Sequence, residues 1–221
     1  MRKTLPRIYA ALFKHFGPQH WWPADGPFEV MVGAILTQNT NWGNVEKAIV
    51  SLKSAGVLTP RKLDTLSHKE RAQLIRSAGY FNVKARRLAA FTRYFMERYE
   101  GSASLMAQCD TVRLRKELLA VKGIGPETAD SILLYACRKP VFVVDAYTKR
   151  IFSRHKLVAE NASYDEVQEI FMDGLRRDQK LFNEYHALIV RTAKEFCVKQ
   201  NPRCKECPLD KNRGKSRCAP A

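Results

Sequence analysis

The segment LLAVKGIGPETADSILLYACRKPVFVVDAYTKR, residues 118–150, decides how this chain is interpreted. Two segments with helical apolar spacing flank the turn Gly123-Ile124-Gly125. Glycine lets a backbone bend sharply and bring its N–H groups close to a phosphate. Asp145 follows a β-branched run and begins the next predicted helix. The turn could therefore bind nucleic acid, and the carboxylate could perform chemistry on it.

Apolar residues recur at helical spacing through the rest of the chain, and glycines separate the segments. No internal repeat occurs, and no alternating strand pattern is longer than residues 141–144. The sequence predicts an all-α fold with helices over 6–16, 28–36, 45–55, 60–66, 68–78, 83–99, 111–121, 126–137, from 145 onward, 164–176 and 181–196.

The 221 residues carry a formal net charge of +16, with a pI of about 9.8. Charge of this size says little about the fold but indicates a polyanionic partner, and the aromatic content suits nucleic acid better than a membrane surface. The N-terminus has no apolar signal sequence, and no run is long enough to span a bilayer. We expect a monomer that acts in the cytoplasm, near the nucleoid, with no membrane partner.

Four cysteines near the C-terminus follow the pattern Cys197-x6-Cys204-x2-Cys207-x10-Cys218. Inside a cell such a group binds metal more often than it forms disulfides, and both zinc and a [4Fe–4S] cluster accept four thiolates. Residues 191–217 also hold nine basic and three acidic side chains. A metal-bound loop that presents Lys199 and Arg203 would form a rigid phosphate contact.

Asp145 has two interpretations. Aspartate is a preferred N-cap in any helix, and spacing alone favours that structural role. A fixed carboxylate could also stabilise positive charge that develops on a sugar, and could orient or deprotonate a water.

The motifs VKGIGPETAD and VVDAYTKR resemble the helix–hairpin–helix/Gly-Pro-Asp superfamily of DNA glycosylases, and its endonuclease III branch in particular. The resemblance covers almost the whole chain. It implies a two-lobed helical fold with a C-terminal iron–sulfur loop, with one lobe over 24–135 and the other over 1–23 plus 136–221. It also implies that Asp145 is the catalytic carboxylate, that Gly123, Gly125 and Lys122 contact DNA, and that the cysteines hold a [4Fe–4S] cluster rather than zinc. The last cysteine spacing is longer than in the family, which makes Cys218 the least secure ligand.

Glu127 departs from the endonuclease III pattern, which has a lysine at this position. That amine attacks the sugar and forms a Schiff base, and the strand is then cleaved. A carboxylate forms no imine, and Lys122 lies at a non-matching position. The departure indicates a monofunctional glycosylase, although Glu127 could also be an ordinary first-turn acid that stabilises its helix.

Trp21-Trp22-Pro23 and the segment ending in Trp42 resemble the 3-methyladenine DNA glycosylase III subgroup, which also has a glutamate at the position of Glu127. The resemblance implies that aromatic side chains of these two segments sandwich the flipped base. An alkylated purine is cationic, and indole faces attract cations. Trp21 or Trp22 could instead belong to the core.

A flipped base leaves a gap in the stack that a side chain must fill. Gln38, Asn39 and Tyr80 lie in the segments that supply fillers and wedges in the family, and Lys84 follows as an expected DNA contact. Tyr80 could equally be a core aromatic.

Three functions remain in view. The first is a monofunctional glycosylase of base-excision repair that removes alkylated purines. The second is a bifunctional glycosylase and abasic-site lyase for oxidised pyrimidines. The third is a non-catalytic DNA-binding protein that uses only the hairpin.

Overall fold

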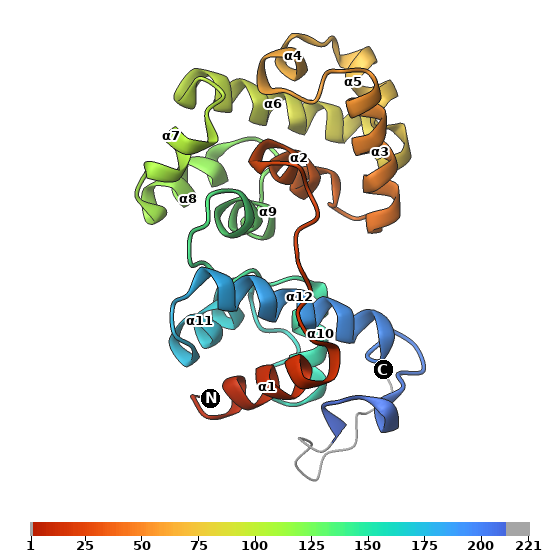
Figure 1. The fold of residues 1–221 in the computed structure, drawn as a ribbon, viewed down its shortest axis with the longest axis vertical. Helices are drawn as coiled ribbons and strands as arrows, with labels where there is room; N and C mark the ends of the chain where they lie inside the picture. Colours follow the sequence, from red (N-terminus) through yellow and green to blue (C-terminus); the bar gives the residue numbers. More distant parts are fainter. Residues whose placement is uncertain (1, 211–221) are drawn as a thin grey trace. The chain divides into compact units, whose positions relative to one another are not determined.

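The computed structural model describes residues 2–210, and these residues are helical and contain no β-strand. The chain divides into two compact units, one formed by residues 22–139 and the other by residues 1–21 and 140–221. Figure 1 shows the helices of each unit. None of the helices described is both long and apolar enough to cross a membrane. The all-α prediction is confirmed.

The unit of residues 22–139 is built around one buried helix. Every residue of α2 from Val30 to Leu36 is buried, as expected for a helix that is apolar on all sides. Phe28 and Phe91 extend this core by stacking on Phe95 of the long helix α6. The helices of this unit are α2 (Pro27–Leu36), α3 (Trp42–Ser54), α4 (Pro60–Thr65), α5 (His68–Leu74), η1 (Arg76–Ala78), α6 (Phe81–Tyr99), α7 (Ala103–Gln108), α8 (Thr111–Ala120), α9 (Pro126–Ser131) and the π-helix η2 (Ile132–Ala136).

The other unit packs its helices on an aromatic centre. Phe142 stacks on Phe171 with ring centroids 3.9 Å apart, and Phe182 and Tyr185 meet Phe142 edge-on. The Tyr185 hydroxyl donates to the backbone oxygen of Leu5 at 3.0 Å, which ties α12 to α1. The helices are α1 (Thr4–Phe16), α10 (Ala146–Arg154), α11 (Tyr164–Gly174), α12 (Gln179–Glu195) and the short 3-10 turn η3 (Cys204–Glu206).

Candidate functional site

The segment 141–144 leads into the candidate catalytic residue as buried, extended chain rather than as part of a sheet. Its backbone groups therefore bond to side chains. The Phe142 N–H donates to the Met172 sulfur at 3.4 Å, and the Phe142 carbonyl accepts from Gln168 Nε2 at 2.6 Å. The Val144 N–H donates to the Tyr164 hydroxyl at 3.3 Å. Because α11 supplies all three partners, the entry into α10 is held in place.

Asp145 is the N-cap of α10. Its Oδ1 accepts from the Thr148 backbone N–H at 2.7 Å and from the Thr148 hydroxyl at 2.8 Å. Only 11% of the side chain is exposed. The capping interpretation is thus correct for one oxygen of the carboxylate, while the second oxygen, Oδ2, is not part of the cap.

His186 lies beside that second oxygen. Its Nε2 is 3.5 Å from Asp145 Oδ2, and it comes from the buried face of α12. Burial acts to raise the pKa of Asp145, but the charge of protonated His186 and hydrogen bonds from His186 and Thr148 outweigh it, so the pKa lies below its usual value. The carboxylate is therefore ionised at neutral pH. Sequence reasoning missed His186 because nothing in the spacing connects it to Asp145.

The predicted hairpin joins α8 to α9. Gly123 has φ +91°, and a Cβ built there would lie 2.4 Å from Arg87 Cγ, so this position requires glycine. Ile124 is buried and anchors the turn, whereas Lys122, Gly123 and Gly125 are exposed. A Cβ at Gly125 would meet no atom of the protein within 4 Å. The fold therefore leaves open space above Gly125.

Gln38 braces this hairpin from within its own unit. Its Nε2 donates to the Gly123 carbonyl at 3.1 Å and to the Thr128 hydroxyl at 2.9 Å. Its Oε1 accepts from Arg87 Nη1. The side chain expected to fill a gap in DNA is thus bonded to the hairpin in this structure. Arg87, the second member of this brace, was not predicted.

The prediction that Lys84 contacts DNA is wrong. The residue is only 1% exposed, and its ammonium donates to the Leu36 carbonyl at 2.8 Å and the Ala78 carbonyl at 2.7 Å. Burial, followed by the nearby charge of Arg87, lowers the pKa of Lys84 to about 8. Lys84 instead joins the end of α2 to the turn before α6.

Those two joined segments present Asn39 and Tyr80. Both side chains are exposed, and Tyr80 is 72% exposed, so it is not a core aromatic. Both residues have left-handed backbones, with φ +53° for Asn39 and +45° for Tyr80. Such conformations are uncommon outside glycine and are often found at functional sites.

Trp22, Pro23 and Trp42 line a cavity of about 150 Å³ in the unit of residues 22–139. The two indole rings meet edge to face, with centroids 5.1 Å apart and planes at 85°. They therefore do not form a parallel sandwich in this structure. A Cβ at Gly33 would lie 3.3 Å from the Trp22 ring, so the ring can pack here because residue 33 has no side chain. Trp21 is half-buried and belongs to the other compact unit.

Two carboxylates also line this cavity, and sequence reasoning did not identify them. Glu46 accepts from Trp42 Nε1 at 2.6 Å, and Glu29 forms an ion pair with Lys53 at 2.8 Å. Glu46 lies one helical turn after Trp42, a spacing that places both on one side of α3. Lys53 lines the cavity as well, so the cavity combines aromatic faces with two carboxylates and one ammonium group.

Three of the four predicted metal ligands, Cys197, Cys204 and Cys207, line a single small cavity, and Cys218 lies outside the described residues. Arg154 Nη1 lies 3.4 Å from the Cys197 sulfur, and Arg150 Nε donates to the Cys197 carbonyl at 2.8 Å. Within residues 2–210, no three metal-binding side chains are gathered closely enough to hold a single ion. The three thiols thus border one space, and a guanidinium lies beside one of them.

Lys199 and Arg203, in the loop that carries Cys197, Cys204 and Cys207, are exposed. The Lys199 carbonyl accepts from Arg154 Nη2 at 2.8 Å. Arg203 lies over the Phe196 ring, 5.5 Å from its centroid, and donates to the Glu195 carbonyl. Arg154 of α10 therefore bonds to the backbone of this loop, and Arg203 of the loop bonds to the backbone at the end of α12.

The family model of the HhH-GPD superfamily base excision DNA repair proteins matches residues 32–177. A protein of Methanocaldococcus jannaschii, provisionally named a DNA repair glycosylase, is 49% identical over 92% of this chain and 92% of its own length. The endonuclease III of Thermotoga maritima is 30% identical over 83% of this chain and 80% of its own.

Two solved structures have similar folds. The 3-methyladenine DNA glycosylase of H. pylori bound to 1,N6-ethenoadenine matches with a TM-score of 0.73 and 29% identity, over 88% of this chain and 95% of the other. A non-covalent endonuclease III–DNA complex matches with a TM-score of 0.81 at 22% identity, over 95% of this chain and 93% of the other. The hairpin, the capped Asp145 and these matches together place the chain in the HhH-GPD superfamily of base excision DNA repair glycosylases, in its endonuclease III-like branch.

Proposed function

We propose that this glycosylase excises cationic, alkylated purines from double-stranded DNA by hydrolysis and does not cleave the strand. The observation that carries the proposal is the cavity of Trp22 and Trp42, which places the carboxylates of Glu29 and Glu46 beside aromatic faces. Indole faces attract cations by about 0.5–2 kcal/mol, and carboxylates add a longer-ranged attraction. A neutral base gains neither the cation–π attraction nor the attraction to the carboxylates.

The H. pylori 3-methyladenine DNA glycosylase supports this substrate class through the base it is named for, since it is 29% identical to this chain. The base bound in its structure is 1,N6-ethenoadenine, which is neutral. Because the two indole rings are perpendicular, a base can be sandwiched between them only if one ring rotates. Pro23 completes the apolar border of the cavity. We therefore assign Trp22, Pro23 and Trp42 to base recognition, and Trp21 joins them on the resemblance of its segment alone.

Asp145 would supply the chemistry. As the C1′–N bond of the flipped nucleotide breaks, its electron pair leaves with the base, and a methylated purine leaves as a neutral molecule. The sugar becomes positively charged, and the ionised Asp145 stabilises it. A water then forms the new bond to C1′, and its proton passes to Asp145 Oδ2. Because Oδ1 is occupied by the cap, Oδ2 is the oxygen available for this step.

The hairpin would hold the DNA backbone. A phosphate can approach Gly125 because no protein atom lies within 4 Å of the place that a side chain would take. The brace of Gln38 and Arg87 keeps the Gly123 carbonyl turned inward. Lys122, Lys199 and Arg203 would add exposed positive charge, and we assign the exposed Asn39 and Tyr80 to filling the gap left by the base.

We exclude strand cleavage from the proposed reaction because residue 127 is a glutamate and not a lysine. Glu127 occupies the first turn of α9, where a lysine would have to form the Schiff base. The amine nearest in sequence, that of Lys122, precedes the turn. Glu127 stabilises its helix start or orients the attacking water, and neither role produces an imine.

Cys197, Cys204 and Cys207, with Cys218, would hold a [4Fe–4S] cluster. The cluster would neutralise the thiolates and hold the loop of Lys199 and Arg203 rigid. The excision reaction needs no electron transfer, so we assign the cluster a structural role. We further propose that the enzyme works as a monomer inside the cell.

The test is an excision panel on duplex DNA. One set of duplexes carries 3-methyladenine or 7-methylguanine, and the other carries thymine glycol, uracil or an abasic site. The proposal predicts release of methylated purines and intact abasic strands. Release of thymine glycol with strand cleavage would support the bifunctional alternative instead. Binding without release of any base would support the non-catalytic one.

A further inference from the structure

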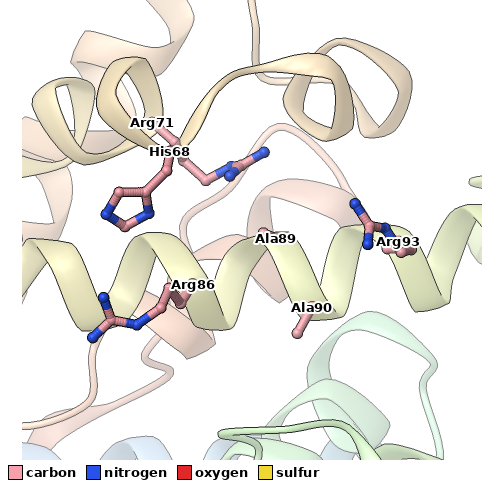
Figure 2. A pocket seen from close by; sticks show the side chains of 6 residues that line it. All are labelled: His68, Arg71, Arg86, Ala89, Ala90 and Arg93. Carbon is pink, nitrogen blue, oxygen red and sulfur yellow. The ribbon is translucent and has the colours of Figure 1, made fainter.

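A second cavity, of about 490 Å³, lies in the unit of residues 22–139 and has no role in the proposed excision reaction. Figure 2 shows that α5 and α6 bound it together. His68 and Arg71 come from α5, and Arg86, Ala89, Ala90 and Arg93 come from α6. The lining holds three arginines and a histidine and no acidic side chain. The two alanines leave room between the cationic groups.

Arg71 is the unusual member of this cavity, because it is a guanidinium only 3% exposed. Its three hydrogen bonds, to the carbonyls of Leu63, Asp64 and Leu66, all leave from Nη2. Its Nε is buried and donates to no acceptor within residues 2–210. A buried donor without an acceptor costs about 1–3 kcal/mol, more when it is charged. This cost would be removed by an acceptor that enters the cavity.

The other two arginines are also available. Arg86 and Arg93 are exposed, and neither forms an ion pair with a residue in the described part of the chain. Burial lowers the pKa of Arg71 and the nearby charge of Arg93 adds to this effect, while the carboxylates of Asp64 and Glu70 oppose it. An anion beside Arg71 and Arg93 would offset the repulsion between these two side chains. Planar guanidinium groups match the geometry of phosphate oxygens in particular.

We propose that this cavity binds a phosphate-bearing anion, which accepts from Arg71 Nε and is paired by Arg86 and Arg93. Its volume accommodates more than one phosphate group or a phosphate with part of its carrier. Two sources share this chemistry. One is the phosphodiester backbone of DNA beyond the damaged base, and the other is a free polyphosphate or nucleotide. The site is separate in composition from the hairpin and from the Trp22–Trp42 cavity.

Tripolyphosphate binding at fixed ionic strength tests the proposal. The probe is titrated by calorimetry into the full-length protein, the R86Q/R93Q variant and the control R7Q/R177Q, which removes the same charge from exposed positions elsewhere. Because each charge-assisted bond contributes about 1.5–3 kcal/mol, we expect binding to weaken by roughly tenfold or more in R86Q/R93Q only. No binding by the wild type, or equal weakening in both variants, would overturn the proposal.

Arg71 is examined without mutation, because its Nη2 bonds hold the α4–α5 turn. The Nε–H resonance of Arg71 should shift during the titration of the wild type and of R7Q/R177Q, and in R86Q/R93Q it should shift only at roughly tenfold or higher tripolyphosphate concentration. A resonance that never moves while tripolyphosphate binds would contradict the assignment of Nε.

Competition identifies the source of the phosphate. If undamaged duplex DNA displaces tripolyphosphate from the wild type, the site holds the DNA backbone. If DNA and tripolyphosphate bind together, it holds a free phosphate ligand. Both results uphold the site.

Discussion

Asp145 and the Trp22–Trp42 cavity differ in how much of their geometry exists before a substrate binds. Asp145 is capped through Thr148, faces His186 and follows a segment whose backbone bonds to α11. The cavity is lined by a loop before α2 and by residues of α2 and α3, and its indole rings lie perpendicular. The proposed reactive carboxylate is thus preorganised, whereas the rings of the proposed recognition surface would have to move to sandwich a base.

This difference has a physical reason. A carboxylate stabilises a transition state best when it needs no reorganisation during the reaction. A base pocket must first admit a nucleotide and then close on it, so exposed aromatic side chains with freedom to rotate suit that role. Changes at Asp145 should therefore affect the rate for every substrate, while changes in the cavity should affect the choice among substrates.

Asp145→Asn should have the largest effect. Asparagine caps a helix as well as aspartate does, so the midpoint of thermal unfolding should change little. The fixed negative charge is lost, and single-turnover excision should fall by about 10²–10³-fold or more, as for other preorganised electrostatic groups. Equal losses should appear for every methylated base. Retained excision would assign Asp145 to capping alone.

His186→Leu should have the next largest effect. Without the positive charge and hydrogen bond of His186, burial raises the pKa of Asp145. Since the active carboxylate is the ionised form, the acid limb of the pH–rate profile should move to higher pH. Excision at mildly acidic pH should then fall by roughly tenfold for each unit of pKa shift. An unchanged profile would show that His186 has no influence on Asp145.

Glu46→Gln tests the recognition half of the comparison. The amide still accepts from Trp42 but has no charge, so excision of cationic 7-methylguanine should fall by about 2- to 30-fold, from a loss of about 0.5–2 kcal/mol. Excision of neutral 1,N6-ethenoadenine should change less. Glu97→Gln, on the exposed face of α6, is the matched control. An equal loss of excision for cationic and neutral bases in Glu46→Gln would contradict the assignment of this cavity to base recognition.

Lys84→Met should have the smallest effect on excision and a measurable one on stability. With its pKa lowered to about 8, folded Lys84 binds fewer protons than unfolded Lys84 between about pH 8 and 10.5, so stability rises with pH in that window. The increase should be about 2 kcal/mol between roughly pH 7.5 and 9.5. Denaturant titrations of the wild type and of Lys84→Met at several pH values measure how the free energy of unfolding rises with pH. The two proteins should show the same pH dependence if Lys84 has an ordinary pKa.

Local signals made much of the fold predictable. The hairpin was recognisable because Gly123 must adopt a positive φ, and the start of α10 because aspartate is a preferred cap. The amphipathic spacing predicted the long helices. The six-residue helix α7 was missed because it is too short to show a periodic pattern.

Long-range contacts were not predictable in the same way. Lys84 was predicted to contact DNA, yet two backbone carbonyls hold its ammonium inside the protein, where lysines are seldom found. The His186–Asp145 pair and the Gln38–Arg87 brace join residues far apart in sequence, and no spacing rule relates them. The carboxylates beside Trp22 and Trp42 became visible only when the helices were packed.

Borohydride trapping on a duplex with an abasic site tests the central claim most directly, because it detects an imine whichever base is the substrate. We predict no covalent adduct with the wild-type protein, since water is the nucleophile and Glu127 occupies the position of the lysine. Glu127→Lys serves as the positive control, in which an adduct should form. A borohydride-dependent adduct with the wild type would contradict the account and establish a bifunctional enzyme.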